Sequence, residues 1–81
     1  MASEQELESL HIIELAVLCQ RAADNPALDN DTRASAAGLE LEWVQLVRRE
    51  TPPPPDFKEE QKIEQDKAVL RMRMVKLLAT I

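Results

Sequence analysis

The sequence is poor in the residues that tight loops, disulfides and most catalytic sites require. Its 81 residues include one glycine, one cysteine, one histidine, one tryptophan, one phenylalanine and no tyrosine. A single cysteine excludes an intrachain disulfide, and a single glycine excludes a glycine-rich phosphate loop. The residues that are abundant, namely Ala, Leu, Glu, Gln, Lys and Arg, favour helices. Composition therefore predicts an all-α protein without strands.

The residues that carry catalysis or bind metals are equally scarce. His11 and Cys19 are eight residues apart on one predicted helix, about 12 Å along its axis, so they cannot form a thiolate–imidazole pair within one chain. His11 and Glu14 are spaced to share a helix face, but a carboxylate-bridged metal site needs more ligands from other helices. Only Glu40 and Glu42 are available for that purpose. We predict a protein that is not an enzyme and that has no cofactor, no metal and no small-molecule substrate.

Long hydrophobic runs are also missing. No apolar segment approaches the roughly 20 residues that a membrane-spanning helix requires. The first residues are acidic and lack the basic region of a signal peptide. Cys19, alone in an aliphatic segment, is expected to act as a small buried apolar residue. These features predict a cytoplasmic protein that makes no use of membranes.

Proline, in contrast, is concentrated at one point, in the run Pro52–Pro55. Each proline fixes φ and removes a backbone donor, so no helix continues through four of them. We expect an extended polyproline connector about 12 Å long. It divides one small domain into a helical hairpin at 1–51, a linker at 52–55 and a C-terminal amphipathic helix at 56–81.

Three helices are predicted, at Glu4–Ala23, Asp31–Glu50 and Phe57–Thr80. Ser3 and Asp56 are placed to cap the first and third, and a residue within 29–31 caps the second. The short link between the first two helices predicts an antiparallel hairpin. The third helix either folds back as the third member of a bundle or docks on another chain.

The predicted helices carry more apolar surface than one hairpin can bury. Only one polar residue interrupts the segment from Ile12 to Cys19, which is apolar around most of the helix. In the third helix, Ile63, Leu70 and Leu77 repeat every seven residues in a short heptad-like stripe. The excess favours a homodimer. The predicted core or interface residues are Ile12, Ile13, Leu15, Val17, Leu18, Leu41, Trp43, Val44, Ile63, Leu70, Met74, Leu77 and Ile81.

The charge is uneven along the chain, and this leaves two alternatives open. Residues 1–56 carry eleven acidic and four basic side chains, whereas residues 57–81 carry four acidic and six basic ones. The favoured function is a small, non-enzymatic helical interaction or regulatory module that associates with itself or with another protein. One alternative is a regulator that binds nucleic acid through the basic C-terminal helix. The other is an acidic nucleic-acid mimic that inhibits a basic partner. The possible polyanion contacts are Lys67, Arg71, Arg73 and Lys76.

Overall fold

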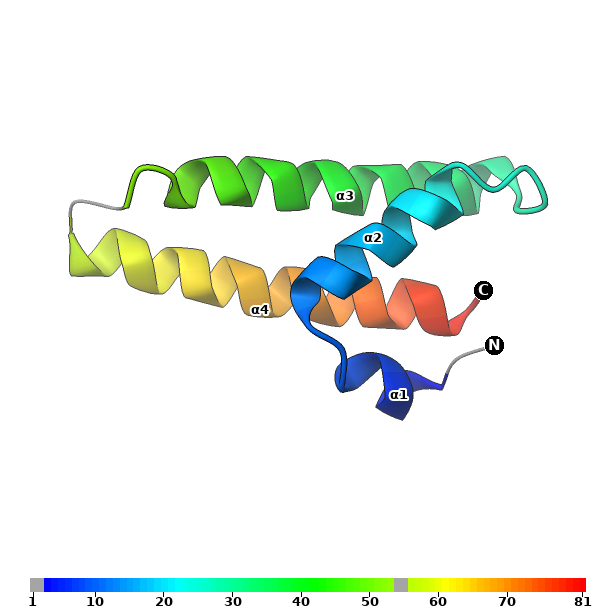
Figure 1. Cartoon of the computed structure of the whole chain (residues 1–81), viewed down its shortest axis with the longest axis horizontal. Helices are drawn as coiled ribbons and strands as arrows, with labels where there is room; N and C mark the ends of the chain where they lie inside the picture. The colour runs from blue at the N-terminus through cyan, green and yellow to red at the C-terminus, as the bar shows by residue number, and fades with distance from the viewer. Residues whose placement is uncertain (1–2, 54–55) are drawn as a thin grey trace.

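The computed structural model describes residues 3–53 and 56–81, which form four helices packed against one another (Figure 1). These are α1 (Glu4–Glu8), α2 (Ile12–Ala23), α3 (Asn30–Glu50) and α4 (Phe57–Ala79). The described residues contain no strand, so the predicted all-α class is confirmed. The two longest helices, α3 and α4, lie side by side and antiparallel, while α2 crosses them obliquely and α1 lies beside α4. The antiparallel hairpin predicted within 1–51 is not shown, because α2 has 12 residues against the 21 of α3 and crosses it obliquely.

The two long helices begin where short polar side chains cap their first turns. The Asp29 carboxylate accepts a hydrogen bond from the Thr32 amide at 2.8 Å, and Asp56 accepts one from the Glu59 amide at 2.8 Å. Such caps satisfy amide groups that have no partner within the helix. The expected ends of the second and third helices are confirmed to within a residue, and Asp29 is the cap among the three candidates.

The prediction of one continuous helix over residues 4–23 is wrong, because the helix is interrupted between Glu8 and Ile12. His11 has an extended backbone, and its Nδ1 accepts a hydrogen bond from the Ile13 amide at 3.2 Å. The Ser9 hydroxyl donates to the Glu6 carbonyl at 2.6 Å. Side chains that bond nearby backbone groups offer an alternative to continued helix. The break turns α1 toward α4 and buries Leu7, which is only 2% exposed.

The connector between α3 and α4 brings the C-terminal helix back onto its own chain. Thr51 ends α3 in an extended conformation, followed by a cis peptide bond to Pro52. Pro54 and Pro55 lie outside the described residues, so an extended run over all four prolines stays a prediction. Arg49 bonds Asp66 at 2.7 Å and Glu59 at 3.2 Å, which joins the end of α3 to the first half of α4. Both carboxylates raise the pKa of Arg49.

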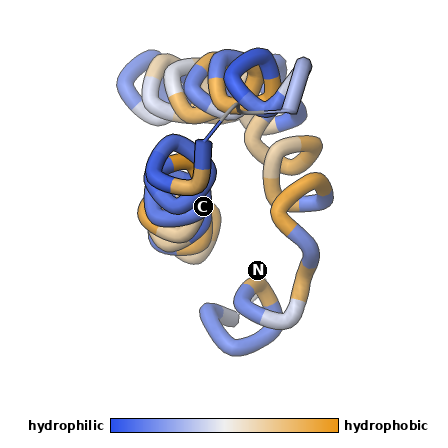
Figure 2. Tube along the Cα trace, turned by 90° about the vertical axis from the view of Figure 1, so that its left-hand side faces the viewer, coloured by the Kyte–Doolittle hydropathy of each residue, from blue (hydrophilic) through white to orange (hydrophobic). Residues whose placement is uncertain are grey.

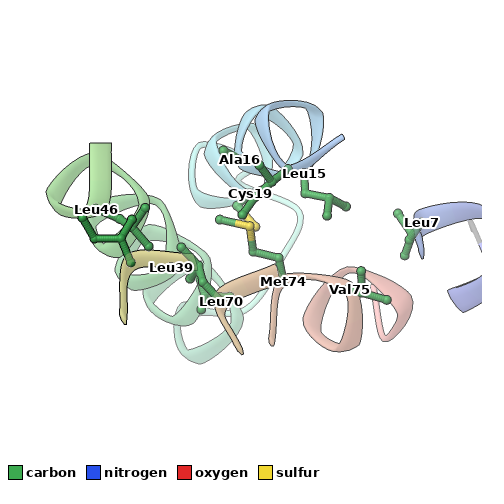
Figure 3. Close-up of a cluster of buried hydrophobic side chains, with 11 residues drawn as sticks. Leu7, Leu15, Ala16, Cys19, Leu39, Leu46, Leu70, Met74 and Val75 are labelled. Atoms are coloured by element: carbon green, nitrogen blue, oxygen red, sulfur yellow. The ribbon is translucent and has the colours of Figure 1, made fainter. Parts of the chain in front are cut away.

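One hydrophobic core is shared by all four helices. Figure 2 views the long helices end on and shows that α3, α4 and the α1–α2 segment surround it from three sides. Cys19 of α2 meets Met74 of α4, and the core also receives Leu15 from α2 and Leu7 from α1 (Figure 3). The buried cluster consists of Leu7, Ile12, Leu15, Ala16, Cys19, Leu39, Leu46, Ile63, Leu70, Met74 and Val75.

The cap at Asp29 predicts a pH dependence of stability. Hydrogen bonds from Thr32 lower the pKa of Asp29 below its usual value of 3.8. Since the folded-state pKa is lowered, the cap's contribution is fully present above the usual pKa and is lost as the pH falls through the folded-state pKa. We expect the thermal midpoint of the native chain to fall more steeply below pH 4 than that of Asp29→Asn, which keeps an acceptor but does not titrate. Thermal unfolding from pH 7 to pH 2 measures this difference, and parallel curves would contradict it.

Candidate interaction surfaces

The structure places the thirteen predicted core or interface residues in three environments. Five of them are buried: Ile12, Leu15, Ile63, Leu70 and Met74. Leu18, Trp43 and Leu77 are half-buried and pack against the core, and Ile81 is half-buried at the end of the chain. Four others lie on the surface: Ile13, Val17, Leu41 and Val44. The heptad-like stripe of α4 therefore faces the interior of its own chain.

The four surface residues are not core residues, and geometry explains why. Ile13 and Val17 are 54% and 40% exposed, on the side of α2 that faces away from its neighbours. Leu41 and Val44 are 57% and 36% exposed on α3. Successive residues of a helix are turned by about 100°, so Leu41 points away from the buried Leu39. Among the described residues, no further helix covers these outer faces, so their interface role stays a prediction.

Sequence reasoning missed several residues that the core uses. Leu39 and Leu46 are spaced by seven and lie on either side of Trp43, a signal as strong as that of Leu41 and Val44. The helix carries two apolar stripes, one with Leu41 and Val44 and one with Leu39, Trp43 and Leu46, and the pattern alone does not tell which stripe faces inward. The sequence pattern around Leu7 and Val75 indicated burial less clearly. The small residues Ala16, Ala22 and Ala36 are also buried.

The basic residues of α4 do not form one continuous surface. Lys67 pairs with Glu50 of α3 and, at 3.5 Å, with Glu64, and Glu50 raises the pKa of Lys67. On different sides of the helix, Arg73 pairs with Glu42 of α3 and Arg71 donates to a carbonyl of α1.

The contacts of the two arginines define those sides. Arg73 lies 2.8 Å from the Glu42 carboxylate, whereas the Arg71 guanidinium donates to the backbone carbonyl of Glu8. Lys76 is exposed farther along the helix. Nucleic-acid binding by these four cations stays a prediction that their arrangement does not favour.

Of the acidic residues in 1–56 that could mimic nucleic acid, Glu40 and Glu42 lie on different sides of α3. Glu42 is paired with Arg73 on the side of α3 that faces α4. Glu40 is half-buried, and its charge acts on Cys19 of α2. The two carboxylates point in different directions, because residues two apart on a helix are turned by about 200°. They do not present a common acidic face.

His11 and Cys19, the candidate histidine and nucleophile, occupy structural positions. His11 is the N-cap of α2, and Cys19 is enclosed in the core. Burial raises the pKa of the Cys19 thiol to about 11, and the negative charge of Glu40 adds to the shift. Within residues 3–53 and 56–81, no three His, Cys, Asp or Glu side chains come together in a group able to hold a metal ion.

The environment of Cys19 predicts a thiol that reacts slowly in the folded chain. Only the thiolate is nucleophilic, and a pKa near 11 leaves little of it at pH 8. We expect alkylation by iodoacetamide to be on the order of a hundredfold slower in the native chain than in chain unfolded by urea. Mass spectrometry of timed, quenched samples measures both rates. Equal rates with and without urea would contradict the buried position.

Comparison with protein-family models, with curated proteins and with solved structures returned no match. Among the described residues, no helix is both long enough and apolar enough to cross a membrane. The function proposed below is therefore argued from the surfaces of the chain itself.

Proposed function

We propose that this chain is a small, non-enzymatic helical interaction module that self-associates as a homodimer and offers its remaining surface to another protein. One observation carries the proposal. The chain closes a core of its own with α4 and still exposes Ile13, Val17, Leu41 and Val44, four large apolar residues on α2 and α3. Large apolar side chains that stay exposed after the core has closed are candidates for an interaction site.

The size of the chain supports the same proposal. An 81-residue domain has limited apolar area to bury, and small domains commonly gain stability from a partner subunit. Val47, next to the exposed residues of α3, is 37% exposed and enlarges the apolar area available for association. Burial of such area contributes about 25 cal/mol per Å² before the cost of association is subtracted.

The proposal predicts the mass of the native chain in solution. We expect light scattering on a sizing column to give twice the formula mass of 9.2 kDa, and to keep that value over a dilution series down to low micromolar concentrations. The physical reason is that dimerisation removes exposed apolar side chains such as Leu41 and Val44 from water. A mass of one chain at every concentration would overturn self-association. The apolar surface would then have to serve another protein.

A further inference from the structure

The solvent-facing side of α3 carries a regular pattern that its own chain does not use. We call Ala34, Ala37, Leu41, Val44 and Arg48 the outer stripe of α3. Their spacings alternate between three and four residues, as in the seam positions of a coiled coil. All five are exposed. The stripe lies opposite Leu39 and Leu46, which point into the core, so α2 and α4 leave it uncovered.

The outer stripe is small at one end and large at the other. Its first two residues are alanines, and its next two are Leu41 and Val44. If a second copy of α3 runs antiparallel, with its Leu41 opposite Ala37, then its Val44 lies opposite Ala34. Each layer then joins a large side chain to a small one, so the two helices approach closely and leave no void. A parallel pair would instead place alanine against alanine.

Charges at the two ends of the stripe agree with the same register. Arg48 of one copy is brought beside Asn30 and Asp31 of the other. Because the two copies are related by two-fold symmetry, the same contact forms again at the opposite end. In the described part of the chain neither Arg48 nor Asp31 forms an ion pair. Antiparallel helices also place the positive end of each macrodipole beside the negative end of its neighbour. Size and charge therefore favour the same partner, which is a second copy of this chain.

We propose that two copies of the chain associate antiparallel through the outer stripe of α3, with Ala37 of one copy opposite Leu41 of the other. This proposal rests on the self-association proposed above and specifies its face and register. The arrangement is isologous, since each copy contributes the same residues.

Disulfide trapping tests the register directly. The variants Ala37→Cys and Leu41→Cys are produced separately, checked for native unfolding midpoints, mixed to allow subunit exchange, and oxidised mildly. We expect a covalent dimer that contains one chain of each variant, which mass spectrometry identifies. Each variant oxidised alone should give at least tenfold less covalent dimer than the mixture. The native chain is the control for Cys19, which is buried and should not cross-link.

The outcomes of this experiment separate the two proposals. Cross-linking of each variant with itself, at the expense of the mixed product, would indicate a parallel pair and overturn the antiparallel register. If light scattering shows a native dimer but neither variant nor their mixture cross-links, the proposed interface on α3 would be overturned while self-association would stand. A native chain that is monomeric at every concentration would overturn both.

Charge reversal provides an independent test. We expect Arg48→Glu to raise the dissociation constant of the dimer about tenfold, because it places a carboxylate beside Asp31 of the other copy. The double variant Arg48→Glu/Asp31→Arg should recover to within about threefold of the native value. Lys62→Glu is the matched control, since it makes the same change of charge at an exposed site on α4. Equal effects of Arg48→Glu and Lys62→Glu would overturn the register.

Discussion

Replacing Leu70 with alanine is expected to lower the free energy of unfolding by about 2–5 kcal/mol, the range observed when a buried leucine is truncated. Leu70 is 3% exposed at the centre of α4 and belongs to the core cluster that includes Leu39 and Met74 (Figure 3). Truncation removes apolar contacts and leaves a cavity between α3 and α4. A domain of this size has a total stability of about 4–12 kcal/mol, so the variant should be partly unfolded at moderate urea concentrations.

Urea titration followed by circular dichroism measures this change, with Val69→Ala as the matched control. Val69 is the preceding residue of α4 and is 51% exposed. Its truncation removes little buried area, so we expect a change within about 0.5 kcal/mol. Leu77→Ala should fall between the two, because Leu77 is half-buried. A Leu70→Ala midpoint equal to that of Val69→Ala would show that the stripe of α4 is not the interior face.

Replacing Leu7 with alanine is expected to release α1 from α4 and to cost about 2 kcal/mol, the lower end of the range for a buried leucine. Leu7 is the one buried residue of α1, a helix of five residues. A helix this short is not stable by itself in water, so it depends on this contact. The loss is limited because α1 can unfold locally while the rest of the core stays packed.

Hydrogen exchange resolves that local event. We expect the backbone amides of α1 to exchange rapidly in Leu7→Ala, whereas the amides at the centres of α3 and α4 keep their protection. Gln5→Ala, an exposed change in the same helix, is the control and should leave exchange of α1 close to native. Unchanged protection of α1 in Leu7→Ala would contradict the proposed role of Leu7 as its anchor.

The placement of surface and core on α3 shows where sequence reasoning reached its limit. Leu39 and Leu41 are two residues apart, both leucine and both within an apolar stripe, yet one is buried and the other is 57% exposed. Nothing local distinguishes them. The side on which α2 and α4 pack decides which stripe becomes core, and that contact depends on residues far away in the sequence. The sequence could therefore name the apolar residues of α3 that are candidates for an interaction surface, but it could not tell which of its two apolar stripes is exposed.

The sequence by itself determined the all-α class and the start of both long helices, because caps such as Asp29 and Asp56 act on amides within three residues. It also determined the end of α3, because the proline run that follows cannot continue a helix. Local bonds at Ser9 and His11 offer the chain a place to leave the helix, and only the tertiary structure decided that it does so there and that α4 packs on its own chain. Both depend on burial of side chains such as Leu7 and Met74 against partners distant in the sequence. Local propensity does not encode such contacts, because their free energy arises only when the helices meet.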